Sequence, residues 1–96
     1  MEIVEKAVDI LAKNVSKDKN ILKVVEECAE LQEVLVKLLT KSEDLKPKQD
    51  KIVEEMGDVL FRIAILSRVL GVDEEVQNRM EDKATIMYNW AVTKFN

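Results

Sequence analysis

The segment from Met56 to Leu70 constrains the fold most, because its side chains are apolar almost all round a helix. At about 100° per residue, its apolar positions leave hardly any polar side for solvent. These positions are Val59, Leu60, Phe61, Ile63, Ala64, Ile65, Leu66 and Val69. A helix of this kind must be covered on every side. Three neighbouring helices in a chain of 96 residues can barely provide that cover, so we expect a second copy of the chain to help.

The remaining sequence predicts an all-α fold. Only two glycines, one proline and four aromatic residues are present, too few for the turns and packed faces of a sheet. We expect a single domain over residues 1–96, a four-helix-type bundle completed by homo-oligomerisation. The polar segment KSEDLKPKQD is the expected linker between the second and third helices. The predicted helices cover about residues 2–14, 18–41, 47–70 and 73–94.

Residues typical of helix ends support these boundaries. Ser16 or Asp18 is available as the N-cap of the second helix. Pro47 suits the first turn of the third helix, and Gly71 suits its C-terminal end. Asp73 is expected to cap the fourth helix.

Composition argues against several classes of function. A net charge of −4 disfavours binding to a nucleic acid polymer, which requires a basic surface. No apolar run reaches the roughly 18 residues of a membrane span, and MEIVEKAVD lacks the layout of a signal peptide. The single cysteine, Cys28, cannot form an internal disulfide; we expect it to be buried, and the protein to be cytoplasmic.

The chain contains no histidine, which narrows its chemistry further. Zinc and non-haem iron sites usually need imidazole, and a di-iron bundle would want Glu-x-x-His on two helices. Any chemistry must therefore depend on carboxylates, lysines, arginines and a metal that they hold.

Two groups of acidic residues interrupt the two central apolar helices. Glu27 and Glu30 are three residues apart on one helix, and so are Glu55 and Asp58 on the next. Residues at this spacing share a helix face, so antiparallel packing would bring all four carboxylates together. Their mutual repulsion would then require a cation. Mg²⁺, with Mn²⁺ as the alternative, is the ion that an all-oxygen site favours.

A structural interpretation of these acidic residues also stands. Glutamate is a good helix former, and the Glu33–Lys37 and Asp58–Arg62 spacings are those of ion pairs on a helix surface. Against this, Glu55 and Asp58 lie in the most apolar helix, where a solvated face is a poor explanation. The residues alone leave both interpretations open.

The order E-E-x-x-E followed by E-x-x-D, on consecutive helices, resembles the MazG-like all-α nucleoside triphosphate pyrophosphohydrolases. Here it is EECAE (26–30) and EMGD (55–58), and the resemblance covers about residues 20–90. It implies Mg²⁺-dependent hydrolysis of a nucleoside triphosphate to the monophosphate and pyrophosphate, by a dimer or tetramer. It further implies that Glu26 orients or deprotonates the attacking water, or that it contacts the metal ligands without binding the metal itself. The implied metal ligands are Glu27, Glu30, Glu55 and Asp58.

Two cations are weaker candidates for binding substrate. Arg62 lies one turn past Asp58 and could meet a phosphate or a base, or simply pair with Asp58. Lys83 could offset phosphate charge, although exposed cations usually do nothing specific.

Two alternative functions share the same predicted fold. One is phosphoribosyl-ATP pyrophosphohydrolase, a sister enzyme in which we would expect a histidine after the second acidic motif. This chain has Phe61 and Arg62 there. The other is a non-catalytic helical oligomerisation module with surface carboxylates.

Overall fold

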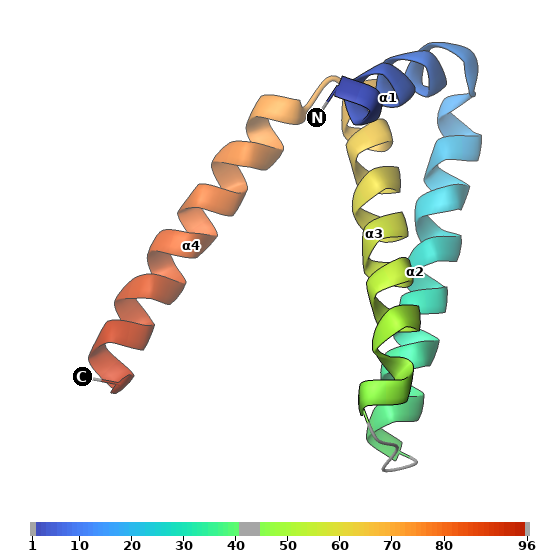
Figure 1. Cartoon of the computed structure of the whole chain (residues 1–96). Coiled ribbons are helices and arrows are strands. Elements are labelled where there is room, and N and C mark those ends of the chain that lie inside the picture. The colour runs from blue at the N-terminus through green and yellow to red at the C-terminus, as the bar shows by residue number, and fades with distance from the viewer. Residues whose placement is uncertain (1, 41–44, 96) are drawn as a thin grey trace.

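The computed structural model of the chain describes residues 2–40 and 45–95. Over these residues it consists of helices without strands, which confirms the all-α prediction (Figure 1). α3 begins at Leu45, inside the segment predicted as a linker, and the predicted end of the second helix at residue 41 lies outside the described residues. None of the helices described is long and apolar enough to cross a membrane. The helices are α1 (Glu2–Asn14), α2 (Lys17–Thr40), α3 (Leu45–Leu70) and α4 (Asp73–Phe95).

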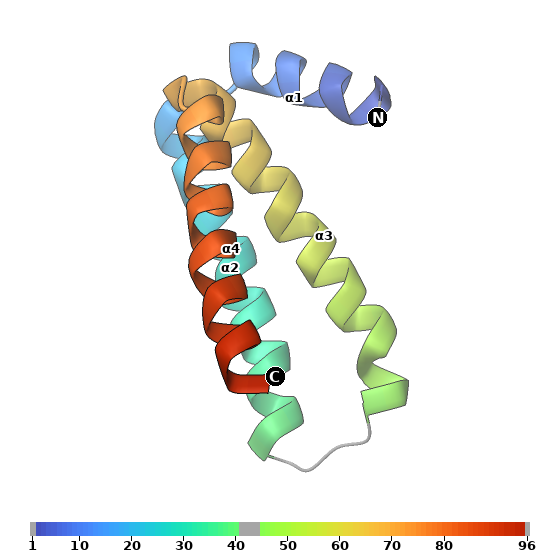
Figure 2. The ribbon, with the colours of Figure 1, turned by 90° about the vertical axis from the view of Figure 1, so that its left-hand side faces the viewer.

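A tight corner joins α1 to α2. The Ser16 hydroxyl accepts a hydrogen bond of 3.2 Å from the backbone N–H of Lys19, so Ser16, not Asp18, is the N-cap of α2. Asn20 is buried, and its amide donates to the backbone carbonyls of Val15 at 3.2 Å and Ser16 at 3.1 Å. These bonds satisfy carbonyls at the corner. α1 thereby lies across one end of the other helices and packs on α3 (Figure 2).

α2 and α3 form a long antiparallel pair that provides most of the contact between helices. The half-buried residues of α2 recur at alternating spacings of three and four, as expected of a helix packed along its length on a partner. From Val24 onward, these residues are Val24, Glu27, Leu31, Val34 and Leu38. A carboxylate thus occupies one position of an otherwise apolar seam.

α4 diverges from α3 and covers little of it (Figure 1). Gly71 has a φ of 68°, and Val72 donates a hydrogen bond of 3.0 Å to the Ser67 carbonyl, which ends α3 as predicted. The new direction leaves Leu60 67% exposed. The expectation that α4 helps to cover α3 is therefore wrong, and one chain alone does not form a four-helix bundle.

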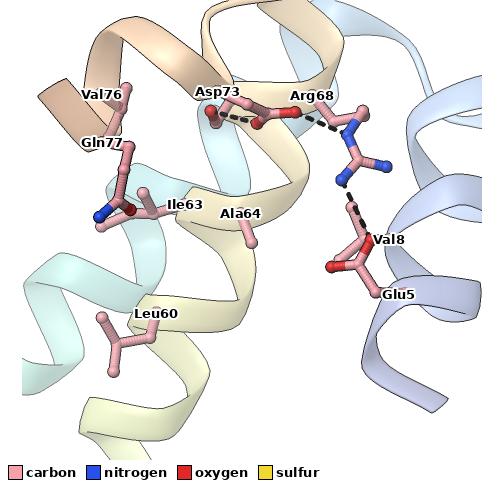
Figure 3. A pocket seen from close by; sticks show the side chains of 10 residues that line it. Glu5, Val8, Leu60, Ile63, Ala64, Arg68, Asp73, Val76 and Gln77 are labelled. Carbon is pink, nitrogen blue, oxygen red and sulfur yellow. Dashed lines mark hydrogen bonds and ion pairs between the residues drawn. The ribbon is translucent and has the colours of Figure 1, made fainter. Parts of the chain in front are cut away.

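Arg68 ties α1, α3 and α4 together at this junction (Figure 3). Its Nε donates to Asp73 Oδ2 at 2.8 Å, and its guanidinium also pairs with Asp9 and with Glu5, the latter at 3.3 Å. The Ser67 hydroxyl donates to Asp73 Oδ1 at 2.5 Å. Both oxygens of Asp73 therefore bind residues of α3, whereas the sequence had suggested that Asp73 caps α4.

We expect Asp73→Asn to lower the thermal unfolding midpoint by a few degrees at pH 7. The Ser67 hydroxyl and then Arg68 lower the pKa of Asp73 below its ordinary 3.8. Stabilisation from a lowered carboxyl pKa is complete above the ordinary value and is lost as the pH falls through the lowered one. The difference between variant and wild type should therefore shrink below pH 4. Glu74→Gln is the control, because it removes a charge from the same helix end without touching Arg68; an equal shift would implicate the helix dipole instead.

The single chain has a small core for its size. Among the described residues, Val8 and Ile65 are the only apolar ones that are almost fully buried. The accessible surface is 7604 Å², against about 5,600 Å² for a compact protein of this mass. The radius of gyration is 16.5 Å, against about 12.5 Å for a compact chain of this length. The chain thus exposes about 2,000 Å² more than a compact monomer would.

Candidate metal centre

Three of the predicted carboxylates meet between α2 and α3. One oxygen each from Glu27, Glu55 and Asp58 lies within 4.8 Å of the others. Glu27 belongs to the half-buried seam of α2, and the spacing of three places Glu55 and Asp58 on one face of α3. The antiparallel arrangement of the two helices then brings the two faces together at the same level. We call these three residues the carboxylate cluster.

The burial of the cluster distinguishes it from a set of surface ion pairs. Glu55 is only 2% exposed, Glu27 is half-buried and Asp58 is exposed. The Oε2 atoms of both glutamates are buried and have no hydrogen-bond partner among the residues that the structure describes. A buried carboxylate oxygen without a partner is costly, and a cation would relieve that cost. The cluster offers only oxygen donors, which are the ligands that Mg²⁺ and Mn²⁺ prefer, so its residues fit such an ion.

Glu30 faces the same cluster from α2, although its side chain is exposed. Repulsion by Glu27, and then by Glu55, raises the pKa of Glu30. Glu30 and Glu55 also border a groove of about 260 Å³ beside the cluster. All four predicted ligands are therefore neighbours, with Asp58 and Glu30 on the solvent side.

Two lysines border this groove, and one of them touches the cluster. Lys51 Nζ lies 2.9 Å from Glu55 Oε1 and 2.9 Å from Glu54 Oε2, and these two glutamates raise the pKa of Lys51. Lys37 pairs with Glu33 at 2.9 Å, as its spacing had suggested. Sequence reasoning did not single out Lys51. Its spacing of four residues from Glu55 was the available signal.

Over the described residues, no ion pair joins the other predicted site residues to the cluster. Glu26 is exposed and pairs with Lys23 at 3.3 Å. Arg62 is half-buried, and within the described part of the chain no ion pair joins it to Asp58. Lys83 borders a different groove, on α4, with Arg79 and Met80 among its neighbours. The structure therefore brings the predicted metal ligands together. Among the described residues, no ion pair links the predicted base or the predicted substrate-binding cations to them.

Cys28 is exposed rather than buried. It therefore lies on a side of α2 that the described part of the chain leaves uncovered.

A family model described as "MazG nucleotide pyrophosphohydrolase domain" matches residues 15–87. The match includes all of α2 and α3 and therefore every residue of the carboxylate cluster. Neither the curated proteins nor the solved structures gave a match to this chain.

Proposed function

The chain belongs to the MazG nucleotide pyrophosphohydrolase domain family, and from this premise we propose that it hydrolyses nucleoside triphosphates to the monophosphate and pyrophosphate. Family membership implies nucleotide pyrophosphohydrolase activity in general. The observation that supports this finer proposal is the pair of buried, unpartnered oxygens of Glu27 and Glu55. They lie in an all-oxygen cluster at the middle of the matched region, where a triphosphate and its cation would meet.

We propose Mg²⁺, or Mn²⁺ in its place, as the cofactor, held by Glu27, Glu30, Glu55 and Asp58. When bound, the cation neutralises phosphate oxygens and lowers the pKa of a bound water. Glu27 and Glu55 supply the buried side of this site, which excludes water from behind the cation. Asp58 and Glu30 lie at its exposed edge, so the triphosphate is proposed to enter there.

Glu26 is proposed to accept the proton of the attacking water or to orient that water. Its carboxylate is exposed, lies one residue before Glu27 and pairs with Lys23 at 3.3 Å. This role requires the Glu26 side chain to leave Lys23 when substrate binds. Arg62, one turn beyond Asp58, is proposed to contact the substrate phosphates.

The working unit is proposed to be a homo-oligomer, a dimer or a tetramer, of one domain over residues 1–96. The excess surface of about 2,000 Å² supports this, since a standard interface covers only about 800 Å² on each partner. Lys83 would then act on the site of a second copy, because α4 does not contact α2 within the described part of its own chain. The enzyme is proposed to act in the cytoplasm on free nucleotides.

Product analysis with a panel of nucleotides tests the proposed reaction. We expect monophosphate and pyrophosphate in equal amounts from at least one nucleoside triphosphate with Mg²⁺ or Mn²⁺, and none with a chelator. Phosphoribosyl-ATP belongs in the panel, so that exclusive hydrolysis of it would identify the sister activity. Orthophosphate as the first product would contradict the proposed bond cleavage. No hydrolysis of any substrate would favour a non-catalytic oligomerisation module.

A further inference from the structure

We propose that Lys51 is a positioning residue of the metal centre: it holds one oxygen of Glu55 so that the other faces the cation. This inference rests on the proposed function, because it concerns how a proposed ligand is oriented. Lys51 itself is not proposed to touch the cation.

The two oxygens of Glu55 have different surroundings. Oε1 lies 2.9 Å from Lys51 Nζ in an ion pair, whereas Oε2 is buried and has no hydrogen-bond partner within residues 2–40 and 45–95. The terminal torsion of a glutamate side chain is broad, so the plane of a free carboxylate rotates easily. The Lys51 contact limits this rotation. Glu55 is therefore left with one oxygen to offer to a cation held among Glu27, Glu55 and Asp58.

Lys51 is itself held in place. Its ammonium also lies 2.9 Å from Glu54 Oε2. Two glutamates one turn farther along α3 therefore both form ion pairs with Lys51. Its side chain is 55% exposed, and so contributes little to the core. Over the described residues, no lysine or arginine pairs with Glu27 or Asp58. The Lys51 contact is therefore the one link between a side-chain cation and the cluster in that part of the chain.

The sign of the effect on cation affinity separates positioning from charge. Removing the Lys51 ammonium takes a positive charge away from the site, and Coulomb's law alone then predicts tighter binding of a cation. Removing a group that orients a metal-bound carboxylate typically weakens metal binding by about 10- to 100-fold. The two explanations therefore predict opposite shifts.

The test measures Mn²⁺ binding without substrate, by the electron paramagnetic resonance signal of free Mn²⁺. We expect Lys51→Met to raise the dissociation constant about tenfold or more, and Lys51→Arg to keep it near the wild-type value. Lys37→Met is the matched control, since Lys37 borders the same groove but pairs with Glu33, outside the cluster. Its dissociation constant should stay the same or fall. Circular dichroism confirms that each variant is folded, and Lys51→Ala repeats the test without the side-chain stem.

Each other outcome overturns the inference in a recognisable way. If Lys51→Met and Lys51→Ala bind Mn²⁺ as tightly as wild type or more tightly, Lys51 is only a surface ion-pair partner, and the metal centre still stands. If Lys37→Met weakens binding as much as Lys51→Met, the loss is not specific to the Glu55 contact. If the wild-type chain binds no Mn²⁺, the proposed function fails, and the inference fails with it.

Discussion

Glu55→Gln is expected to lower kcat/KM for triphosphate hydrolysis more than about a hundredfold, the upper range for losing a residue that only supports a metal ligand. Glu55 is the one residue of the cluster that combines three features. It is 2% exposed, one of its oxygens is unpartnered, and the other is held by Lys51. Glutamine preserves the shape of the side chain but replaces one oxygen with an amide nitrogen, which cannot bind a cation. Steady-state pyrophosphate release measures the loss.

Glu54→Gln provides a matched control for this experiment. Glu54 adjoins Glu55, carries the same group and contacts the same Lys51 ammonium, but it is exposed and outside the cluster. It should lose far less activity than Glu55→Gln, because Glu54 reaches the cluster only through Lys51. Thermal unfolding with and without Mn²⁺ gives an independent readout, because a cation that binds only the folded chain raises the midpoint. That rise should occur in wild type and Glu54→Gln and should be lost in Glu55→Gln. Equal losses in both variants would show that Glu55 has no special role.

Sedimentation equilibrium at micromolar concentration is expected to give a mass of at least twice the 11.0 kDa of one chain. The reason is the apolar surface that the divergence of α4 leaves open. Leu60 and Ile63 of α3 and Val76 of α4 border a pocket of about 340 Å³ (Figure 3), and they remain 67%, 39% and 37% exposed. Soluble monomers rarely keep such a surface uncovered.

Leu60→Glu should shift the equilibrium toward the 11.0 kDa species, because burying an unpaired carboxylate in an apolar interface is costly. Ile10→Glu is the control, since Ile10 is 61% exposed but does not line this pocket. It should leave the mass unchanged. A wild-type chain that is monomeric and fully active would contradict both the interface and the need for a second copy.

The local features of this protein could be predicted from its sequence. Helical periodicity and end residues predicted four helices close to their observed bounds, because such signals act within one or two turns. The spacing of three between Glu55 and Asp58 predicted that they share a face for the same reason. Placing Glu27 opposite them needed only the further assumption of antiparallel packing, which the linker between two long helices favours.

What depends on packing between helices could not be read from the sequence. Glu55 and Glu54 are adjacent glutamates, yet one is buried and the other exposed, because only the contact of α3 with α2 selects the side that is covered. Aspartate is a residue type that commonly caps helices, but at Asp73 the nearby end of α3 offers Ser67 and Arg68 as stronger partners. The direction of α4 follows from that turn and from Gly71. That direction leaves an apolar face uncovered. The pattern of side chains in the sequence specifies which residues avoid water, but it does not specify which surface covers them.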